Sequence, residues 1–124
     1  MRTLSIIPVL LLFFLLGTPS YSADFNKGLT AARNGDFATA LREWMPLAEK
    51  GDATAQINLG VMYEDGRGVP VDYRRAVKWY KRAAEQGDVR AQVNLGLMLA
   101  NGTGVKKNKY IVNIVNIYTM YKFF

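Results

Sequence analysis

The stretch Asp52-Ala-Thr-Ala-Gln-Ile-Asn-Leu-Gly60-Val-Met62 returns as Asp88-Val-Arg-Ala-Gln-Val-Asn-Leu-Gly96-Leu-Met98, 36 residues further along the chain. The glycine pair in Gly66-Arg-Gly68-Val69 returns as Gly102-Thr-Gly104-Val105 at the same offset. One offset that serves separate stretches of a 124-residue chain indicates a tandem structural repeat. A chain of this length allows one small domain at most.

The first half of the repeat predicts a helix over residues 53–65. Its apolar side chains Ala55, Leu59 and Met62 recur at i, i+4 and i+7, which places them on one face of a helix. Asp52 comes directly before this segment, where an aspartate favours the N-cap.

The second half of the repeat predicts another helix over residues 73–86, which Asp72 would cap. Gly66 and Gly68 end the preceding helix and form a loop, because glycine accepts positive φ angles. Pro70 opposes any simple continuation of that helix. The inner face of the second helix is predicted to comprise Tyr73, Ala76, Val77, Tyr80, Ala83 and Ala84.

Small residues at fixed positions predict close packing between helices. Gly60 falls in the middle of a predicted helix, where glycine costs about 1 kcal/mol relative to alanine, so a neighbouring helix is expected to approach it closely. Tyr63, Trp79 and Tyr80 would fill the volume between helix pairs. The further positions assigned to the structure of the repeat are Ala55, Leu59, Met62, Gly66, Gly68, Ala76, Ala83, Ala84, Gly87, Ala91, Leu95, Gly96, Gly102 and Gly104.

The pattern Ala-Gln-x-Asn-Leu-Gly-x-Met-Tyr…Gly-x-Gly-Val-Pro…Asp-Tyr…Ala-x-x-Trp-Tyr…Ala-Ala-Glu-x-Gly-Asp resembles the Sel1-like repeat, a relative of the tetratricopeptide repeat. Residues 52–87 form the one complete copy. The resemblance implies an all-α fold, a short α/α solenoid of antiparallel helix pairs. It also implies a role in holding protein partners together, and bacterial members of the family are often exported.

Two incomplete units flank the complete copy. Residues 23–51 form an N-terminal unit without the Gly-x-Gly-Val loop, which makes it similar to a tetratricopeptide or capping repeat. Its first helix is expected at 25–34, and Trp44 and Pro46 fit a second helix that the proline would kink. Residues 88–108 form a partial Sel1-like repeat.

Residues 1–22 have the features of a secretory signal peptide. Arg2 provides a positive start, and residues 6–16 form an apolar run too short for the roughly twenty residues that span a bilayer. Cleavage between Ser22 and Ala23 is preferred, because cleavage one residue later would put the bulky Tyr21 at a position that the peptidase reads. The alternative is an uncleaved anchor. Cleavage predicts a periplasmic or secreted protein that meets the membrane only through this segment.

Residues 109–124 depart from the repeat. Where the repeat predicts aromatic residues at 115 and 116, the sequence has Val115 and Asn116. Lys, Asn, Ile, Tyr and Phe dominate, which suggests a frameshift or truncation after about Asn108. This atypical tail could form a helix, a strand or an aggregation-prone segment.

Composition excludes several kinds of chemistry. The chain contains no cysteine and no histidine, so it has no disulfide, no thiol nucleophile, and neither the commonest general base nor the commonest metal ligand. The ten carboxylates mostly occupy predicted caps or last turns, and solvated or capping roles are expected for them. The Gly-x-Gly loops follow helices and lack a third glycine, so they predict turns and no nucleotide site. No catalytic, cofactor or metal residue is predicted.

Four polar residues recur on the first helices and are the candidate partner-binding positions: Gln56, Asn58, Gln92 and Asn94. They could hydrogen-bond a bound peptide on a concave surface, or they could bond locally between repeats.

The formal net charge is +6 and falls to +5 without Arg2. Arg74, Arg75, Lys78, Lys81 and Arg82 make one predicted helix strongly basic. This surface is either simply solvated or weakly attractive to acidic partners and surfaces. An exported protein is not expected to bind nucleic acid.

The sequence therefore predicts an exported, non-enzymatic module that binds an unidentified protein or peptide on a helical repeat surface. Two alternatives remain open. The chain could be a truncated or frameshifted remnant without function. A cell-wall-related activity, as suggested for some cysteine-rich Sel1-like proteins, is the weaker alternative because this chain has no cysteine.

Overall fold

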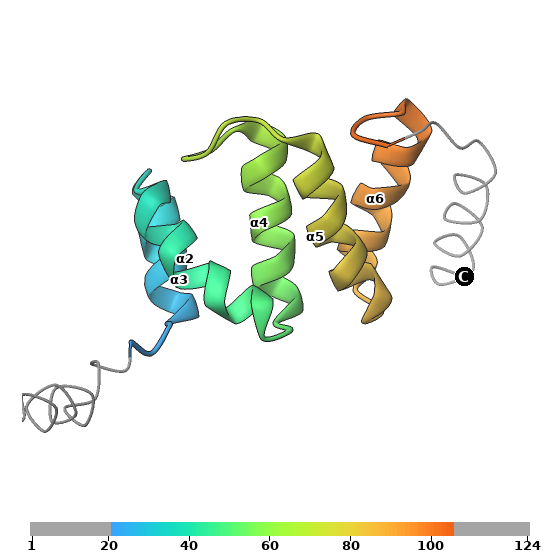
Figure 1. Ribbon diagram of the computed structural model, residues 1–124. Helices are drawn as coiled ribbons and strands as arrows, with labels where there is room; N and C mark the ends of the chain where they lie inside the picture. Colours follow the sequence, from blue (N-terminus) through green and yellow to red (C-terminus); the bar gives the residue numbers. More distant parts are fainter. Residues whose placement is uncertain (1–20, 106–124) are drawn as a thin grey trace, which may run out of the picture.

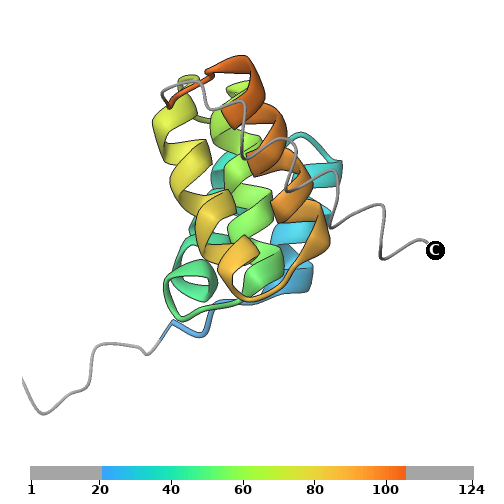
Figure 2. The same ribbon diagram turned by 90° about the vertical axis from the view of Figure 1, so that its right-hand side faces the viewer.

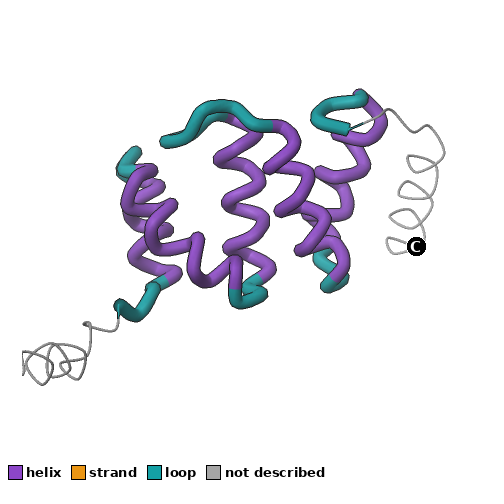
Figure 3. The backbone as a smooth tube through the Cα atoms, in the orientation of Figure 1, coloured by secondary structure: helices purple, strands orange, loops and turns teal. Residues whose placement is uncertain are grey.

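The computed structural model describes residues 21–105, which form helices joined by loops with no strand among them (Figure 3). The predicted atypical tail and all of the predicted signal peptide before Tyr21 lie outside these residues. In chain order the helices are α2 (Phe25–Arg33), α3 (Phe37–Glu49), α4 (Ala53–Asp65), α5 (Tyr73–Glu85) and α6 (Val89–Asn101), as Figure 1 shows.

The helices stack in two layers. Each helix packs against the next one along the chain, from α2 on α3 to α5 on α6. Viewed from the end of the stack in Figure 2, α2, α4 and α6 lie along one side and α3 and α5 along the other. This arrangement is the short α/α solenoid that the repeat predicts. We call α2, α4 and α6 the first-helix layer and α3 and α5 the second-helix layer.

Every helix of the described part begins at an aspartate whose carboxylate accepts a hydrogen bond from the first turn. Asp52 accepts from the backbone N–H of Ala55 at 2.7 Å, and Asp72 accepts from that of Arg75 at 3.0 Å. Removing such a cap typically costs about 1 kcal/mol. The remaining capping aspartates are Asp24, Asp36 and Asp88.

An aromatic ring lies against a glycine within each of the first two helix pairs. A Cβ atom at Gly60 in α4 would overlap the ring of Tyr80 in α5, and one at Gly28 in α2 would overlap the ring of Trp44 in α3. Tyr80 is fully buried, and Trp44 is nearly so. The close approach expected at Gly60 is therefore real, and the group that approaches is an aromatic ring.

The Gly-x-Gly loops cover the start of the second helix in the unit before them. Gly68, at a φ of 69°, lies against Phe37 at the start of α3, and Gly104, at 70°, lies against the backbone of Tyr73. The prediction that Tyr73 faces the core was wrong, because its side chain is 44% exposed. The loop covers the backbone of Tyr73 and leaves its ring in solvent.

Most of the predicted repeat positions lie in the core. Ala84, Leu95, Gly66, Gly102 and Gly104 are half-buried, and Gly68 and Gly87 are exposed in their loops. Pro46 does not end its helix, because α3 continues through it to Glu49. The fully or nearly fully buried positions are Ala55, Leu59, Gly60, Met62, Tyr63, Ala76, Val77, Trp79, Tyr80, Ala83, Ala91 and Gly96.

Candidate partner-binding surface

An apolar pair recurs on each helix of the first-helix layer, on either side of an Asn-x-Gly sequence. The pair is half-buried on α2, more deeply buried on α4 and exposed on α6. Ile57 is 6% exposed, whereas its equivalent Val93 is 37% exposed and Leu97 is 57% exposed. We call these positions the apolar stripe, which comprises Phe25 and Leu29 of α2, Ile57 and Val61 of α4, and Val93 and Leu97 of α6.

At the junction between the first two units, the apolar stripe borders a small pocket. Asn58 and Val61 of α4 line it together with Ala32 and Trp44 from the preceding unit. Its volume is about 120 Å³, enough for a small side chain. Trp44 donates its ring N–H to the carbonyl oxygen of Phe25 at 3.2 Å, so the indole nitrogen needs no further partner.

At the next junction, the equivalent positions hold a polar cluster. The hydroxyl of Tyr80 donates to a carboxylate oxygen of Glu64 at 2.7 Å. Burial, followed by the neighbouring Glu64 carboxylate, raises the pKa of Tyr80 well above its ordinary value. Asn94 of α6 also lies at this hydroxyl, and its side-chain hydrogen bond partly offsets that increase. Tyr80 therefore remains a neutral hydrogen-bond donor at any physiological pH.

The two recurring glutamines link neighbouring helices inside the stack. Gln56 is 3% exposed, donates to the carbonyl oxygen of Ala48 at 2.9 Å, and accepts from the side chain of Gln86 at 2.9 Å. Gln92 donates to the carbonyl oxygen of Ala84 at 3.3 Å. Local bonding between units, one of the two predicted alternatives, describes both glutamines. Asn58 and Asn94 are half-buried beside the apolar stripe and remain candidate contacts.

The asparagine series has a third member, which was not predicted from the sequence. Asn26 in α2 has the same apolar neighbours and the same following glycine, within Phe25-Asn-Lys-Gly-Leu29. The match was hidden because Asn26 lies 32 residues before Asn58, whereas Asn58 lies 36 residues before Asn94. A search for the short motif at several offsets would have found it.

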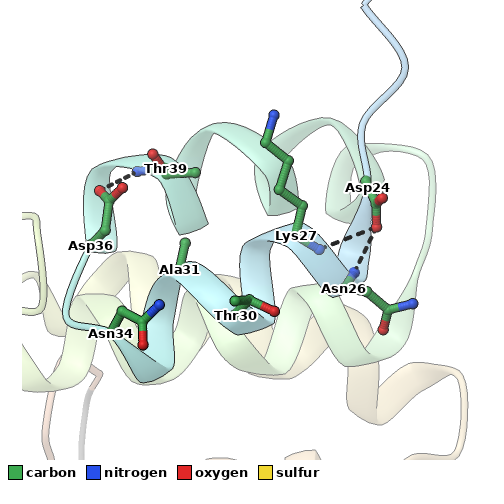
Figure 4. Close-up of a pocket in the computed structure, with 8 residues that line it drawn as sticks. All are labelled: Asp24, Asn26, Lys27, Thr30, Ala31, Asn34, Asp36 and Thr39. Carbon is green, nitrogen blue, oxygen red and sulfur yellow. Dashed lines mark hydrogen bonds between the residues drawn. The ribbon is translucent and has the colours of Figure 1, made fainter.

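Asn26 also lines a wide, open depression of about 600 Å³ at the N-terminal end of the stack. Figure 4 shows that polar side chains surround it, among them Lys27, Thr30 and Asn34. Two of its carboxylates, Asp24 and Asp36, are already bonded to backbone N–H groups at the starts of α2 and α3. The lining of this depression is therefore mostly polar.

Glu43 departs from the prediction that carboxylates are solvated or capping, because its side chain is fully buried within α3. One carboxylate oxygen accepts from the backbone N–H of Asp24 at 3.0 Å, and Lys27 Nζ lies 3.0 Å from the other. The hydroxyl of Tyr21, that N–H and the Lys27 ammonium lower the pKa of Glu43 from 4.5 to about 2. Glu43 thus ties the segment before α2 to α3.

Within residues 21–105, no three acidic side chains gather where they could hold a metal ion. None of the helices in this part is both long enough and apolar enough to cross a bilayer. The described surface also carries the apolar stripe, with Val93 and Leu97 exposed on α6.

Two layers of antiparallel helices joined by Gly-x-Gly loops define a helical repeat protein. The model of the Sel1 repeat matches residues 53–88 and 89–110. The chain therefore carries two Sel1 repeats. Proteins built from these repeats generally mediate protein–protein interactions and are typically non-catalytic scaffolds. A search among curated proteins found no match.

Two solved structures are similar to this chain. One is c5321, described as a protective antigen present in uropathogenic Escherichia coli strains, with 45% identity over 59% of this chain and a TM-score of 0.58. The other is a Sel1 repeat protein from Oxalobacter formigenes, with 36% identity over 68% of this chain and a TM-score of 0.65. The present chain spans 16% of the first protein and 35% of the second.

Proposed function

We propose that the chain is an exported module that binds a protein or peptide on its first-helix layer and catalyses no reaction. The observation that carries this proposal is the exposure of Val93 and Leu97 at positions whose equivalents in α4 are packed. Large apolar side chains that stay in solvent one helical turn apart provide an anchor for a partner. The family supplies the general role, because Sel1 repeat proteins hold protein partners.

Asn58 and Asn94 support a peptide rather than a purely apolar ligand. Each lies next to the apolar stripe on α4 or α6, and both side-chain amides can donate and accept. A peptide carries unpaired backbone groups that need such partners when it leaves water. Apolar side chains of the partner would then cover Leu97, and burying the exposed part of this side chain would contribute about 1–2 kcal/mol.

The binding proposal is tested by comparing two exposed apolar positions. Leu97→Asp puts a carboxylate in the apolar stripe, and Val71→Asp puts one on the loop before α5, where the side chain is 51% exposed. We expect proteins that are retained by the immobilised full chain to be lost with Leu97→Asp, with binding weakened about tenfold or more, and kept with Val71→Asp. Equal retention by both variants would contradict the proposal.

Export is tested separately. The full chain is produced in a bacterium, and the N-terminal residue of the protein recovered from the periplasm or medium is determined. We expect Ala23, because the apolar run and the small residues before it fit signal peptidase. Recovery of the uncleaved chain from the cytosol alone would contradict this part of the proposal and leave the binding surface unaffected.

A further inference from the structure

The outward face of α5 holds an unusual share of the positive charge. Five of its thirteen residues are cationic and one, Glu85, is acidic, whereas the rest of the described chain has six cations and nine acids. With 100° between successive residues, the five cations fall within about a third of the helix circumference. The basic character of the described part is thus confined to one helix of the second-helix layer.

Two of these cations are already engaged with acids of the same chain. Arg75 lies 3.3 Å from a carboxylate oxygen of Asp72 and contacts the hydroxyl of Tyr63 at 3.4 Å. Lys81 lies 3.9 Å from Glu85. Arg74, Lys78 and Arg82 have no carboxylate within ion-pair distance among residues 21–105. We call these three side chains the basic row.

Arg82 is held in place for an incoming anion. Its guanidinium stacks on the ring of Trp79, with the central carbon 4.9 Å from the ring centroid. An arginine held over an aromatic ring can still present its N–H groups to a carboxylate, which they can bind through two hydrogen bonds. The ring itself is nearly buried, so the helix core supports this arrangement.

The spacing of the basic row sets the spacing of its ligand. Arg74, Lys78 and Arg82 are four residues apart, so they succeed one another by about 6 Å along the helix axis. In an extended polypeptide, side chains on the same face repeat every second residue, about 6.6 Å apart. An extended segment with acidic residues at alternate positions therefore matches the row.

From this match we propose that α5 binds an acidic, extended polypeptide segment whose alternate carboxylates contact Arg74, Lys78 and Arg82. An anionic bilayer fits less well, because the row is one helix wide and has Asp72 and Glu85 at its ends, which a flat anionic surface would also meet. The surface lies on the second-helix layer, away from the apolar stripe. The two proposals can therefore fail independently.

The test uses a fluorescent peptide of alternating Glu and Ala as the probe and the full chain as the receptor. Arg74→Gln/Lys78→Gln/Arg82→Gln removes the row. The matched control Arg33→Gln/Arg42→Gln/Lys50→Gln removes the same charge from exposed positions elsewhere. We expect the first variant to weaken binding about tenfold and the control to change it far less, with both keeping the wild-type circular dichroism spectrum.

A peptide of the same composition with its glutamates in one block should bind less tightly, because it cannot match the row along its length. Equal weakening by the two triple variants would show that net charge alone drives binding and would overturn the proposal. Binding to vesicles of phosphatidylglycerol, with none to the alternating peptide, would overturn it as well.

Discussion

The two junctions of the stack use the same backbone arrangement and differ in what they place at the surface. Within the helix pair that precedes each junction, an aromatic ring of the second helix covers a glycine of the first helix, Trp44 on Gly28 and Tyr80 on Gly60. In α2, Ala32 borders the pocket at the first junction, whereas its equivalent in α4 is Glu64.

The consequence appears in the apolar stripe. At the first junction Val61 packs partly against the core, but at the second its equivalent Leu97 is 57% exposed. Successive repeats can thus keep the same buried core while the equivalent surface position is packed in one repeat and exposed in the next. The following predictions test this difference, beginning with the largest expected effect.

The first prediction concerns the ring shared by core and junction. Tyr80→Ala removes a fully buried ring and leaves Glu64 without its donor, so we expect a loss of about 3–5 kcal/mol in the free energy of unfolding. Urea denaturation followed by circular dichroism measures it. Tyr80→Phe keeps the ring and should lose only about 1 kcal/mol. Similar losses for both would mean that the ring does not support the junction.

The second prediction concerns the glycine beneath that ring. Gly60→Ala should destabilise the protein by about 1–3 kcal/mol, although alanine is the better helix former, because its Cβ would overlap Tyr80. Gly28→Ala should behave in the same way at the first junction. Thr54→Ala, at a half-buried position of α4, serves as the control and should have little effect. A rise in melting temperature for Gly60→Ala would refute the close packing.

The third prediction concerns acid. The pKa of Glu43 is about 2 in the folded chain and 4.5 ordinarily, so its carboxylate stabilises the fold above pH 4.5. This contribution is lost as the pH falls from about 4.5 to about 2. Glu43→Gln should remove that part of the pH dependence, as measured by denaturation at several pH values. An unchanged slope in this window would contradict the proposed tie between the segment before α2 and α3.

The smallest effect on stability is expected at the junction between the second and third units, where the apolar stripe is exposed. Leu97→Ser should change the free energy of unfolding by less than about 0.5 kcal/mol, because the side chain is mostly in solvent. Val61→Ser, at the equivalent packed position, should cost about 1–2 kcal/mol. The same denaturation series compares them, and equal values would show that the two junctions do not differ.

The sequence was enough to predict the elements of the fold. Helical spacing and the aspartates before each helix placed α4 at its observed bounds and α5 within one residue of its end. These signals are local, since caps and periodicity act within a turn or two of helix. The close approach of a neighbouring helix to Gly60 was also expected, because a glycine inside a helix needs a packing reason, but the sequence did not show that the approaching group is the ring of Tyr80.

Whether a side chain lies inside the stack or at its surface depends on contacts between helices, so it was harder to predict. Nothing local distinguishes Gln56, which bonds inside the stack, from Asn58, which lies at its surface. Glu43 resembled a solvated helix residue because its partners, Asp24 and Lys27, belong to another helix. Likewise, Leu97 repeats the pattern of Val61, and its exposure follows from the tertiary arrangement alone.

The central claim is that a partner binds at the exposed Val93 and Leu97 of α6. Its most direct test places a photo-crosslinking amino acid at position 97 of the full chain, and in a matched variant at position 71, in cells that produce the protein. We predict one discrete crosslinked protein from position 97 and none from position 71. Crosslinks of equal yield and pattern from both positions, or none from position 97, would contradict the claim.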